Sequence, residues 1–174
     1  MQETHPLKVL KYCPKCGSSG FEISGNRSLK CKSCGFHLYI NSSAAVAALI
    51  TDENGKLMLV TRGVEPDYGK LDLPGGFIDP GESAENAIKR ELYEELGMKI
   101  KSLKYINSAP NKYIFSEYTV YTIDLVYEVI PENITGLKPM DDILDYRFYA
   151  EDEIDYEDIP ASSIRKFVQD FFKQ

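Results

Sequence analysis

The sequence of 174 residues has no tryptophan and only two histidines, and none of its apolar runs is long enough to cross a bilayer. A membrane-spanning helix takes about 20 consecutive apolar residues, so we expect no membrane partner. The N-terminal stretch MQETHPLKVLKY contains no apolar core ahead of a small-residue cleavage site, so no secretory signal is expected. Internal repeats and low-complexity tracts are also missing. We therefore expect a globular, cytoplasmic protein.

The scarcity of histidine limits the acid–base chemistry. His37 follows Cys34 by three residues, a spacing at which a histidine can bind the same metal ion as the cysteine. The chain has four cysteines, however, and four thiolates are enough to complete a tetrahedral metal site without His37. We interpret both His5 and His37 as non-catalytic, which leaves no obvious histidine base.

Acidic residues outnumber basic ones, and the formal net charge is −7 at pH 7. Residues 1–40 carry six Lys/Arg and two Asp/Glu, a balance of +4, whereas residues 41–174 carry 14 and 25, a balance of −11. The larger part repels nucleotides at long range, so an anionic substrate needs a divalent cation to bridge it to the protein. Nucleic-acid binding is disfavoured, and only the basic first 40 residues leave it open.

All four cysteines fall in two CxxC pairs, Cys13/Cys16 and Cys31/Cys34, with 14 residues between the pairs. Four thiolates at this spacing predict a closed, structural Zn²⁺ site in a small zinc ribbon over residues 1–40. The alternatives are two disulfides, against which a cytoplasmic setting argues, and a redox-active CxxC, which needs no second pair. A Zn²⁺ ion bound by four thiolates has a net charge of −2, which lowers the net charge of the ribbon from +4 to about +2.

A helix is predicted within the stretch Gly76–Met98, GFIDPGESAENAIKRELYEELGM. Ser83 is a suitable N-cap, and Gly97 is suited to end the helix. Apolar residues recur at steps of three and four and predict a buried stripe of Ala84, Ala87, Ile88, Leu92 and Leu96.

Three glutamates fall on another face of this helix. Glu91, Glu94 and Glu95 are spaced three and four residues apart, so their carboxylates converge. Carboxylate oxygens are the ligands that Mg²⁺ and Mn²⁺ prefer, whereas a solvated acidic face is the alternative. Arg90 precedes Glu94 by four residues and can pair with it, either to position it or as an ordinary surface ion pair.

The same stretch resembles the Nudix box, GX5EX7REUXEEXGU, in which U is a bulky aliphatic residue. All nine specified positions are filled, by Gly76, Glu82, Arg90, Glu91, Leu92, Glu94, Glu95, Gly97 and Met98. The resemblance implies the fold of that family, an α/β (α+β) arrangement with a mixed β-sheet sandwiched between helices. It also implies divalent-metal-dependent hydrolysis of a diphosphate linkage in a nucleoside diphosphate derivative.

Each position in the box implies a role. Glu91 and Glu95 resemble direct metal ligands, and Glu94 resembles a further ligand or the base that takes a proton from the attacking water. The backbone oxygen of Gly75 resembles a main-chain metal ligand, and Arg90 resembles the residue that holds the acids in place.

Members of the family often add an acid from beyond the box. Asp142 is the first choice for this metal ligand, Asp124 the second and Glu117 the third, and a solvated surface acid is the alternative for each of them. Glu82 resembles a support of the loop and helix and is not expected to be catalytic.

A four-cysteine ribbon ahead of a Nudix box also resembles the NADH pyrophosphatases. Their motif SQPWPFPxS is represented here by Ser108–Tyr113, which keeps Ser-x-Pro and a later aromatic residue but no tryptophan. The substrate is therefore left open among NAD(H), ADP-ribose, another ADP-linked compound and a nucleoside triphosphate. Ser108, Tyr113 and Phe115 are the implied substrate-binding residues, and packing on a strand face is the alternative for the two aromatic rings.

Outside the box, strands are predicted over residues 43–50, 56–61, 99–105, 118–130 and 146–149, with a hairpin turn at 52–55. Loops are predicted over residues 107–116 and 131–142, and an acidic connection over 151–159. Ser162 and Ser163 open a last helix with the core stripe Ile164, Phe167, Val168 and Phe171. We predict two domains, a zinc ribbon (1–40) and a Nudix hydrolase domain (41–174).

Two classes of function fit these patterns. The first is an enzyme, a metal-dependent pyrophosphohydrolase that acts on a small nucleotide substrate. The second is a regulatory or binding module that senses a nucleotide while its ribbon contacts a partner. The complete set of Arg90, Glu91, Glu94 and Glu95 favours the enzyme, because a sensor does not need the hydrolytic acids. The oligomeric state is left open, with a homodimer as one option.

Overall fold

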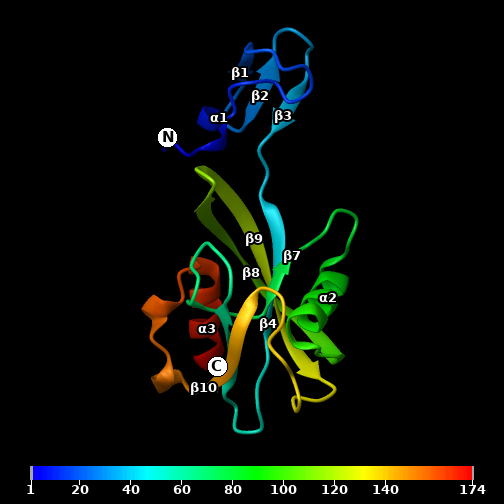
Figure 1. Ribbon diagram of the computed structural model, residues 1–174, viewed down its shortest axis with the longest axis vertical. Helices are drawn as coiled ribbons and strands as arrows, with labels where there is room; N and C mark the ends of the chain where they lie inside the picture. Colours follow the sequence, from blue (N-terminus) through cyan, green and yellow to red (C-terminus); the bar gives the residue numbers. More distant parts are fainter. Residues whose placement is uncertain (1, 174) are drawn as a thin grey trace. The chain divides into compact units, whose positions relative to one another are not determined.

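The computed structural model describes residues 2–173, which form two compact units (Figure 1). The first unit holds the residues up to Ser42 together with Lys112–Tyr121, and the second holds Ser43–Asn111 and the residues from Thr122 onward. The predicted division into residues 1–40 and 41–174 stays a prediction. Within residues 2–173, no helix is long and apolar enough to cross a membrane.

The first unit is built around a small antiparallel sheet. A one-turn helix precedes three strands in the order β1-β2-β3: α1 (Pro6–Val9), β1 (Phe21–Ile23), β2 (Ser28–Cys31) and β3 (His37–Tyr39). The buried apolar cluster of this unit consists of Leu7, Cys13, Phe21, Leu29 and Cys31. So small a core is rarely sufficient without a metal or a cross-link.

The tip of a long hairpin completes the first unit. Strands β8 (Ile100–Phe115) and β9 (Tyr118–Pro131) are joined by Ser116 and Glu117, whose φ angles are 49° and 59°. The backbone N–H of Thr119 donates to the carbonyl of Thr4 at 2.8 Å, and the hydroxyls of these two residues also lie 2.8 Å apart. The N-terminal segment is thereby tied to the hairpin tip.

The second unit contains two sheets, one in the order β7-β4-β9-β8 and the other in the order β10-β5-β6. Strand β4 runs parallel to β9 and antiparallel to β7, so the first sheet is mixed. The remaining strands are β4 (Ser43–Leu49), β5 (Leu57–Arg62), β6 (Leu71–Asp72), β7 (Gly75–Phe77) and β10 (Ile143–Tyr149). The helices are α2 (Ala84–Leu96), η1 (Glu151–Glu153), η2 (Tyr156–Asp158) and α3 (Ser162–Phe172).

Helices α2 and α3 cover opposite faces of these sheets (Figure 1). Alternate residues of a strand point to opposite faces. On β4, Val46 and Ala48 pack in the core cluster of α2, whereas Ala47 and Leu49 pack in the core cluster of α3. The predicted sandwich of a mixed sheet between helices is confirmed, and the predicted apolar stripes of both helices lie in these two clusters.

The predicted loop over residues 107–116 is wrong, because all but the last of these residues belong to β8. Two features obscured the strand. The turn residues Ser116 and Glu117 adopt positive φ without the Asn-Gly or Asp-Gly that usually indicates such a hairpin. Pro110 lacks an N–H and would interrupt a central strand, but β8 lies at the edge of its sheet, where proline is tolerated.

The predicted hairpin at residues 52–55 is only partly correct. The turn forms, with Asp52 Oδ1 accepting the N–H groups of Asn54 and Lys56 at 2.9 and 2.8 Å. The strands on its two sides then diverge, because β4 joins one sheet and β5 the other. Strand β10 begins at Ile143, three residues earlier than the predicted start at Tyr146.

Candidate functional site

Local sequence signals fix both ends of α2. At the N-terminus, Ser83 Oγ accepts the N–H of Asn86 at 3.3 Å. At the C-terminus, Gly97 has a left-handed φ of 65°, and its N–H donates to the carbonyl of Tyr93 at 2.9 Å. Both predicted helix ends are confirmed. With its apolar stripe packed on the sheet, α2 directs its acidic face toward the loop that follows β7.

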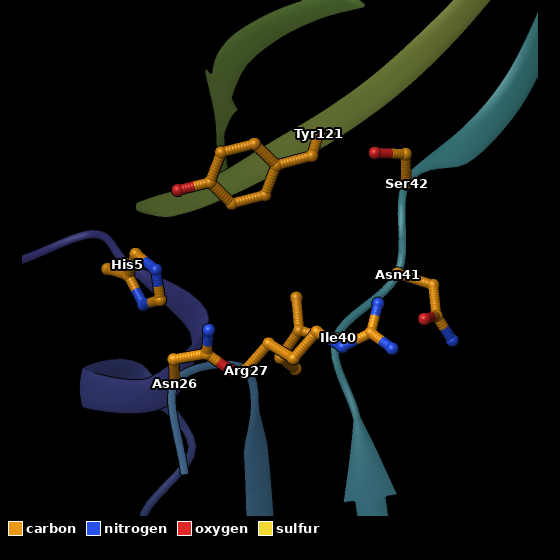
Figure 2. A pocket seen from close by; sticks show the side chains of 7 residues that line it. All are labelled: His5, Asn26, Arg27, Ile40, Asn41, Ser42 and Tyr121. Atoms are coloured by element: carbon orange, nitrogen blue, oxygen red, sulfur yellow. The ribbon is translucent and has the colours of Figure 1, made fainter.

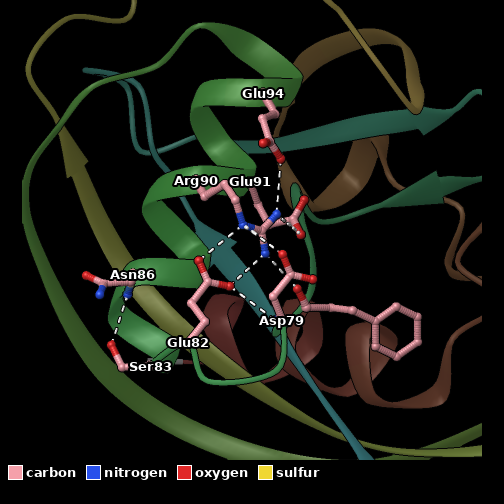
Figure 3. Close-up of polar contacts among 8 residues, drawn as sticks. Asp79, Glu82, Ser83, Asn86, Arg90, Glu91 and Glu94 are labelled. Atoms are coloured by element: carbon pink, nitrogen blue, oxygen red, sulfur yellow. Dashed lines mark hydrogen bonds and ion pairs between the residues drawn. The ribbon is translucent and has the colours of Figure 1, made fainter.

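Arg90 is the centre of a network that joins α2 to this loop (Figure 3). Its Nε and Nη2 donate to the two carboxylate oxygens of Glu82 at 3.1 and 2.8 Å. Its Nη1 donates to Glu91 at 2.8 Å and to Glu94 at 3.0 Å. Its Nη2 also donates to the carbonyl of Phe77 at 3.0 Å. One guanidinium therefore fixes three carboxylates and the loop backbone.

This network favours the charged forms of Glu82 and Arg90. Hydrogen bonds from Arg90 lower the pKa of Glu82, and the same bonds raise the pKa of Arg90 above its usual range. The Arg90–Glu94 pair that the spacing predicts is present, although Glu82 receives two hydrogen bonds and Glu94 only one. The side chain of Glu94 is 46% exposed, so water reaches it freely.

Glu95 is the buried member of the acidic cluster, with 6% of its surface exposed. Its Oε2 accepts the N–H of Gly75 at 3.0 Å, and no cationic side chain within residues 2–173 pairs with it. The pKa of Glu95 is raised to about 8, mainly by burial. The N–H of Gly75 opposes this rise, and the charges of Glu91, Asp72 and Asp142 add to it. A buried carboxylate among other acids is costly unless a cation joins them.

Two glycines bring the backbone against these acids. A Cβ on Gly76 would lie 2.6 Å from the carboxyl carbon of Glu91, which is closer than real contacts allow. Gly75 has a φ of 142°, and a Cβ there would lie 2.2 Å from the carbonyl oxygen of Val46. Burial raises the pKa of Glu91, and its hydrogen bond from Arg90 opposes that rise. Gly75 is therefore required sterically, whereas a Cβ on Gly76 would force the Glu91 carboxylate out of its position.

The three acids considered from beyond the box lie in different places. Asp142 directly precedes β10, is exposed, and is close enough to contribute to the raised pKa of Glu95. Asp124 is buried in β9 and accepts a hydrogen bond from the hydroxyl of Ser163 on α3. Glu117 lies in the hairpin turn of the first unit. Of these three acids, Asp142 is the one whose charge contributes to the raised pKa of Glu95.

Asp72 also acts on the cluster, although no motif in the sequence predicts this role. It ends β6, three residues before Gly75, and its charge contributes to the raised pKa of Glu95. Arg62 Nη1 donates to its carboxylate at 2.8 Å, while burial raises the pKa of Asp72. One feature of the sequence could have indicated this role: Asp72 lies between two leucines, just before the pair Gly75–Gly76.

The predicted substrate-binding residues are spread along β8. Ser108 belongs to the second unit, whereas Tyr113 and Phe115 belong to the first. Strand alternation places Ser108 on the other face of β8 from the two aromatic residues. Tyr113 is half-buried and Phe115 is 52% exposed. Their role in substrate binding stays a prediction.

The four cysteines of the first unit form a compact cluster in which all Sγ atoms lie within 4.8 Å of one another. The Sγ atoms of Cys13 and Cys34 are 3.8 Å apart, those of Cys16 and Cys31 are 3.6 Å apart, and all four thiols are free. A tetrahedron with Zn–S bonds of about 2.3 Å has edges of about 3.8 Å, so these separations fit zinc rather than disulfides.

Backbone turns support this cluster. The N–H groups of Gly17 and Gly35 return to the carbonyls of Cys13 and Cys31 at 2.8 and 3.0 Å, and both glycines have left-handed φ angles. A hydrogen bond from the backbone of Cys34 is the main cause that lowers the pKa of the Cys31 thiol to about 6, which favours the thiolate that a metal binds. The ring of His37 contacts Ser28 Oγ at 3.0 Å and is not part of the cluster.

Known proteins resemble this chain in sequence. The family model of the NUDIX domain matches residues 41–171. The "NAD-capped RNA hydrolase NudC" of Pseudomonas syringae pv. tomato is 35% identical over 98 residues, which are 56% of this chain and 34% of that protein. The protein of the same name from Pseudomonas fluorescens is 27% identical over 167 residues, which are 93% of this chain and 55% of that protein. The chain thus spans about a third to about half the length of these relatives.

Solved structures resemble it in fold. A NUDIX hydrolase from Nitrosomonas europaea superposes with a TM-score of 0.68 at 23% sequence identity. The superposition covers 94% of this chain and 91% of the chain of that hydrolase. The NUDIX domain of Shewanella oneidensis NrtR, complexed with ADP ribose, superposes with a TM-score of 0.57 at 18% identity, covering 78% and 87%. At these identities the likeness concerns the fold alone.

Proposed function

From the premise that this chain belongs to the Nudix family, we propose that it is a pyrophosphohydrolase that cleaves a diphosphate linkage with the help of Mg²⁺ or Mn²⁺. The substrate is a nucleoside diphosphate derivative such as ADP-ribose or NAD(H). The names of the relatives from Pseudomonas support the inclusion of NAD-capped RNA among the candidates.

The observation that carries this proposal is the environment of Glu95. This carboxylate is buried beside Glu91, and within residues 2–173 it has no cationic side chain as a partner. Arg90 is already engaged by Glu82, Glu91 and Glu94. Folding therefore brings together acids whose full ionisation is costly unless a cation binds them, and carboxylate oxygens are the ligand type that Mg²⁺ and Mn²⁺ take.

The donor set thus fits a divalent cation. Glu91 and Glu95 would hold it, with the backbone oxygen of Gly75 and the carboxylate of Asp142 as further ligands. When bound, such a cation neutralises charge on the phosphates and lowers the pKa of a bound water.

The side chains of this chain divide the remaining work. Arg90 keeps Glu91 and Glu94 in fixed positions through hydrogen bonds of 2.8 and 3.0 Å, so that their carboxylates need no rearrangement to meet a cation or the attacking water. Glu94 is the most exposed of the three glutamates, and we assign it to accept the proton of the attacking water or to hold a further cation. Glu82 supports the loop through Arg90 and through the N–H of Asp79 at 3.2 Å.

We assign a structural zinc to the cysteine cluster of the first unit. Its four thiolates leave no open coordination position, so the metal stabilises the fold and takes no part in hydrolysis. A homodimer and a cytoplasmic location stay predictions.

Incubation of the purified protein with a substrate panel tests the hydrolase. The panel holds ADP-ribose, NAD(H), NAD-capped RNA and nucleoside triphosphates, each with Mg²⁺ and with Mn²⁺, and the products are identified by mass spectrometry. We expect metal-dependent release of a nucleoside monophosphate from at least one compound. Turnover should be lost in Glu95→Gln and kept in Glu85→Gln, a matched change at an exposed glutamate of the same helix.

The rival reading, a nucleotide-sensing module, predicts a different result. Such a protein would bind a compound of the panel tightly and turn over none of them. That outcome, obtained with protein that contains its zinc, would refute the hydrolase.

A further inference from the structure

The first unit contains a pocket of about 170 Å³ that lies outside the acidic cluster (Figure 2). Its lining comes from the N-terminal segment, the β1–β2 turn, the segment that follows β3 and the hairpin tip: His5, Asn26, Arg27, Ile40, Asn41, Ser42 and Tyr121. All of these residues belong to the first unit. A drug-sized ligand needs a pocket of about 300 Å³ or more, so this one suits a single small group.

Hydrogen-bond donors dominate the lining, and no lining residue is acidic. Within residues 2–173, the side chains of Arg27, Asn26, Asn41 and Tyr121 have no hydrogen-bond or ion-pair partner. His5 Nδ1 accepts the N–H of Leu7 at 3.1 Å, so the neutral ring carries its proton on Nε2, where it is a donor. A guanidinium with several amide, hydroxyl and imidazole donors is the set that binds a phosphate group.

An aromatic platform adjoins the guanidinium. The Cζ of Arg27 lies 6.0 Å from the ring centroid of Tyr39, and the rings of Tyr39 and His37 lie 4.5 Å apart. Tyr39 is 50% exposed on β3, and Lys30 on β2 is paired with His37 across the sheet. Exposed rings beside cations bind single-stranded nucleic acids, because bases stack on the rings while phosphates meet the cations.

The charge of the unit agrees with such a partner. Its residues up to Ser42 carry six Lys/Arg and two Asp/Glu, and Lys112–Tyr121 adds one of each. The balance of +4 falls to about +2 with zinc and four thiolates, whereas the whole chain has −7. The anion is therefore attracted to this unit and repelled by the other.

We propose that the first unit binds a single-stranded nucleic acid, with one backbone phosphate held in the pocket by Arg27 and a base stacked on Tyr39. Binding requires neither the glutamates of α2 nor a divalent cation, so it holds whether or not the chain hydrolyses a diphosphate.

Fluorescence anisotropy with a labelled oligouridylate of about 12 nucleotides, which has no diphosphate linkage, tests the proposal on the full zinc-containing chain. Arg27→Gln should weaken binding about tenfold at moderate salt and reduce the slope of log affinity against log salt by about 0.7, the value for one phosphate of a single strand. Arg27→Lys should restore the slope but not the full affinity, because it keeps the charge and loses the planar fork.

Matched variants distinguish a loss of binding at the pocket and Tyr39 from the loss of any positive charge or any exposed ring in the unit. Lys11→Gln removes the same charge from the same unit outside the pocket, and Tyr12→Ala removes a ring that is 67% exposed, as a match for Tyr39→Ala. We expect Tyr39→Ala to weaken binding about tenfold and Tyr12→Ala to leave it nearly unchanged. Zinc content, measured for each variant, shows that the unit is folded.

Two outcomes would overturn the proposal. Equal losses in Arg27→Gln and Lys11→Gln would mean that the strand is held by diffuse charge. The second outcome is binding of inorganic phosphate alone, detected as shifts of the side-chain amide signals of Asn26 and Asn41 in NMR spectra, without measurable binding of the oligonucleotide. That result would assign the pocket to free phosphate.

Discussion

Replacing Glu95 by Gln should change how the stability of the metal-free protein depends on pH. Burial raises the pKa of Glu95 to about 8 in the folded protein, from 4.5 in the unfolded chain. The folded state therefore binds this proton more tightly. The stability that the group contributes is complete below pH 4.5 and is lost as the pH rises through about 8.

The size of the effect follows from the shift. The difference between 4.5 and about 8, at 1.36 kcal/mol for each pH unit, sets a ceiling of about 5 kcal/mol. Glu95 is only 6% exposed, so solvent screening removes little of this. Glutamine has the same shape and can still accept the N–H of Gly75, but it never ionises. Glu95→Gln should therefore match the wild type near pH 5 and exceed its free energy of unfolding by several kcal/mol near pH 8.5.

Urea unfolding followed by circular dichroism, in buffer without Mg²⁺ or Mn²⁺, measures this difference at the two pH values. Glu85→Gln is the control, because this glutamate is exposed on the same helix. Saturating Mn²⁺ should restore the stability of the wild type at pH 8.5 and should have little effect on Glu95→Gln. An equal difference between Glu95→Gln and the wild type at both pH values would mean that Glu95 ionises at no cost, contrary to its raised pKa.

Three further substitutions test the site and the ribbon. Arg90→Gln should lower kcat by about 100-fold in steady-state kinetics, because Arg90 holds Glu91 and Glu94 in place. Lys89→Gln, at an exposed neighbour, should leave kcat unchanged. Gly76→Ala places a Cβ 2.6 Å from the carboxyl carbon of Glu91 and should displace that carboxylate. The affinity for Mn²⁺, measured by calorimetry, should therefore fall at least tenfold. An unchanged affinity would contradict this contact. Cys31→Ser should abolish zinc binding in metal analysis and unfold the first unit, whereas full zinc content would exclude the four-thiolate site.

Elements whose signals are local could be predicted from the sequence. The cap at Ser83, the left-handed residue at Gly97 and the apolar stripe between them lie within one stretch, and α2 forms as that stretch indicates. The cysteine cluster is similar, because the spacing of the two pairs already specifies four ligands. The role of Arg90 was only partly accessible, since its strongest contact is with Glu82, eight residues earlier in the chain and outside the helix.

Features that depend on distant pairing could not be predicted. The tip of β8 was missed because Ser116 and Glu117 are not usual hairpin residues, and because the tolerance of Pro110 depends on the edge position of the strand. Asp72 raises the pKa of Glu95 from more than twenty residues away in the sequence, because the fold brings the two charges near each other. The divergence of β4 and β5 into separate sheets likewise follows from their partners rather than from the turn between them.

Isothermal titration of Mn²⁺ at pH 8 tests most directly whether the glutamates of α2 hold a divalent cation. The wild type should bind Mn²⁺ and release protons as it does so, because the ion displaces the proton that Glu95 retains in the metal-free protein. The double variant Glu91→Gln/Glu95→Gln should lose both the binding and the proton release, while Glu85→Gln keeps both. Undiminished Mn²⁺ affinity in the double variant would contradict the account.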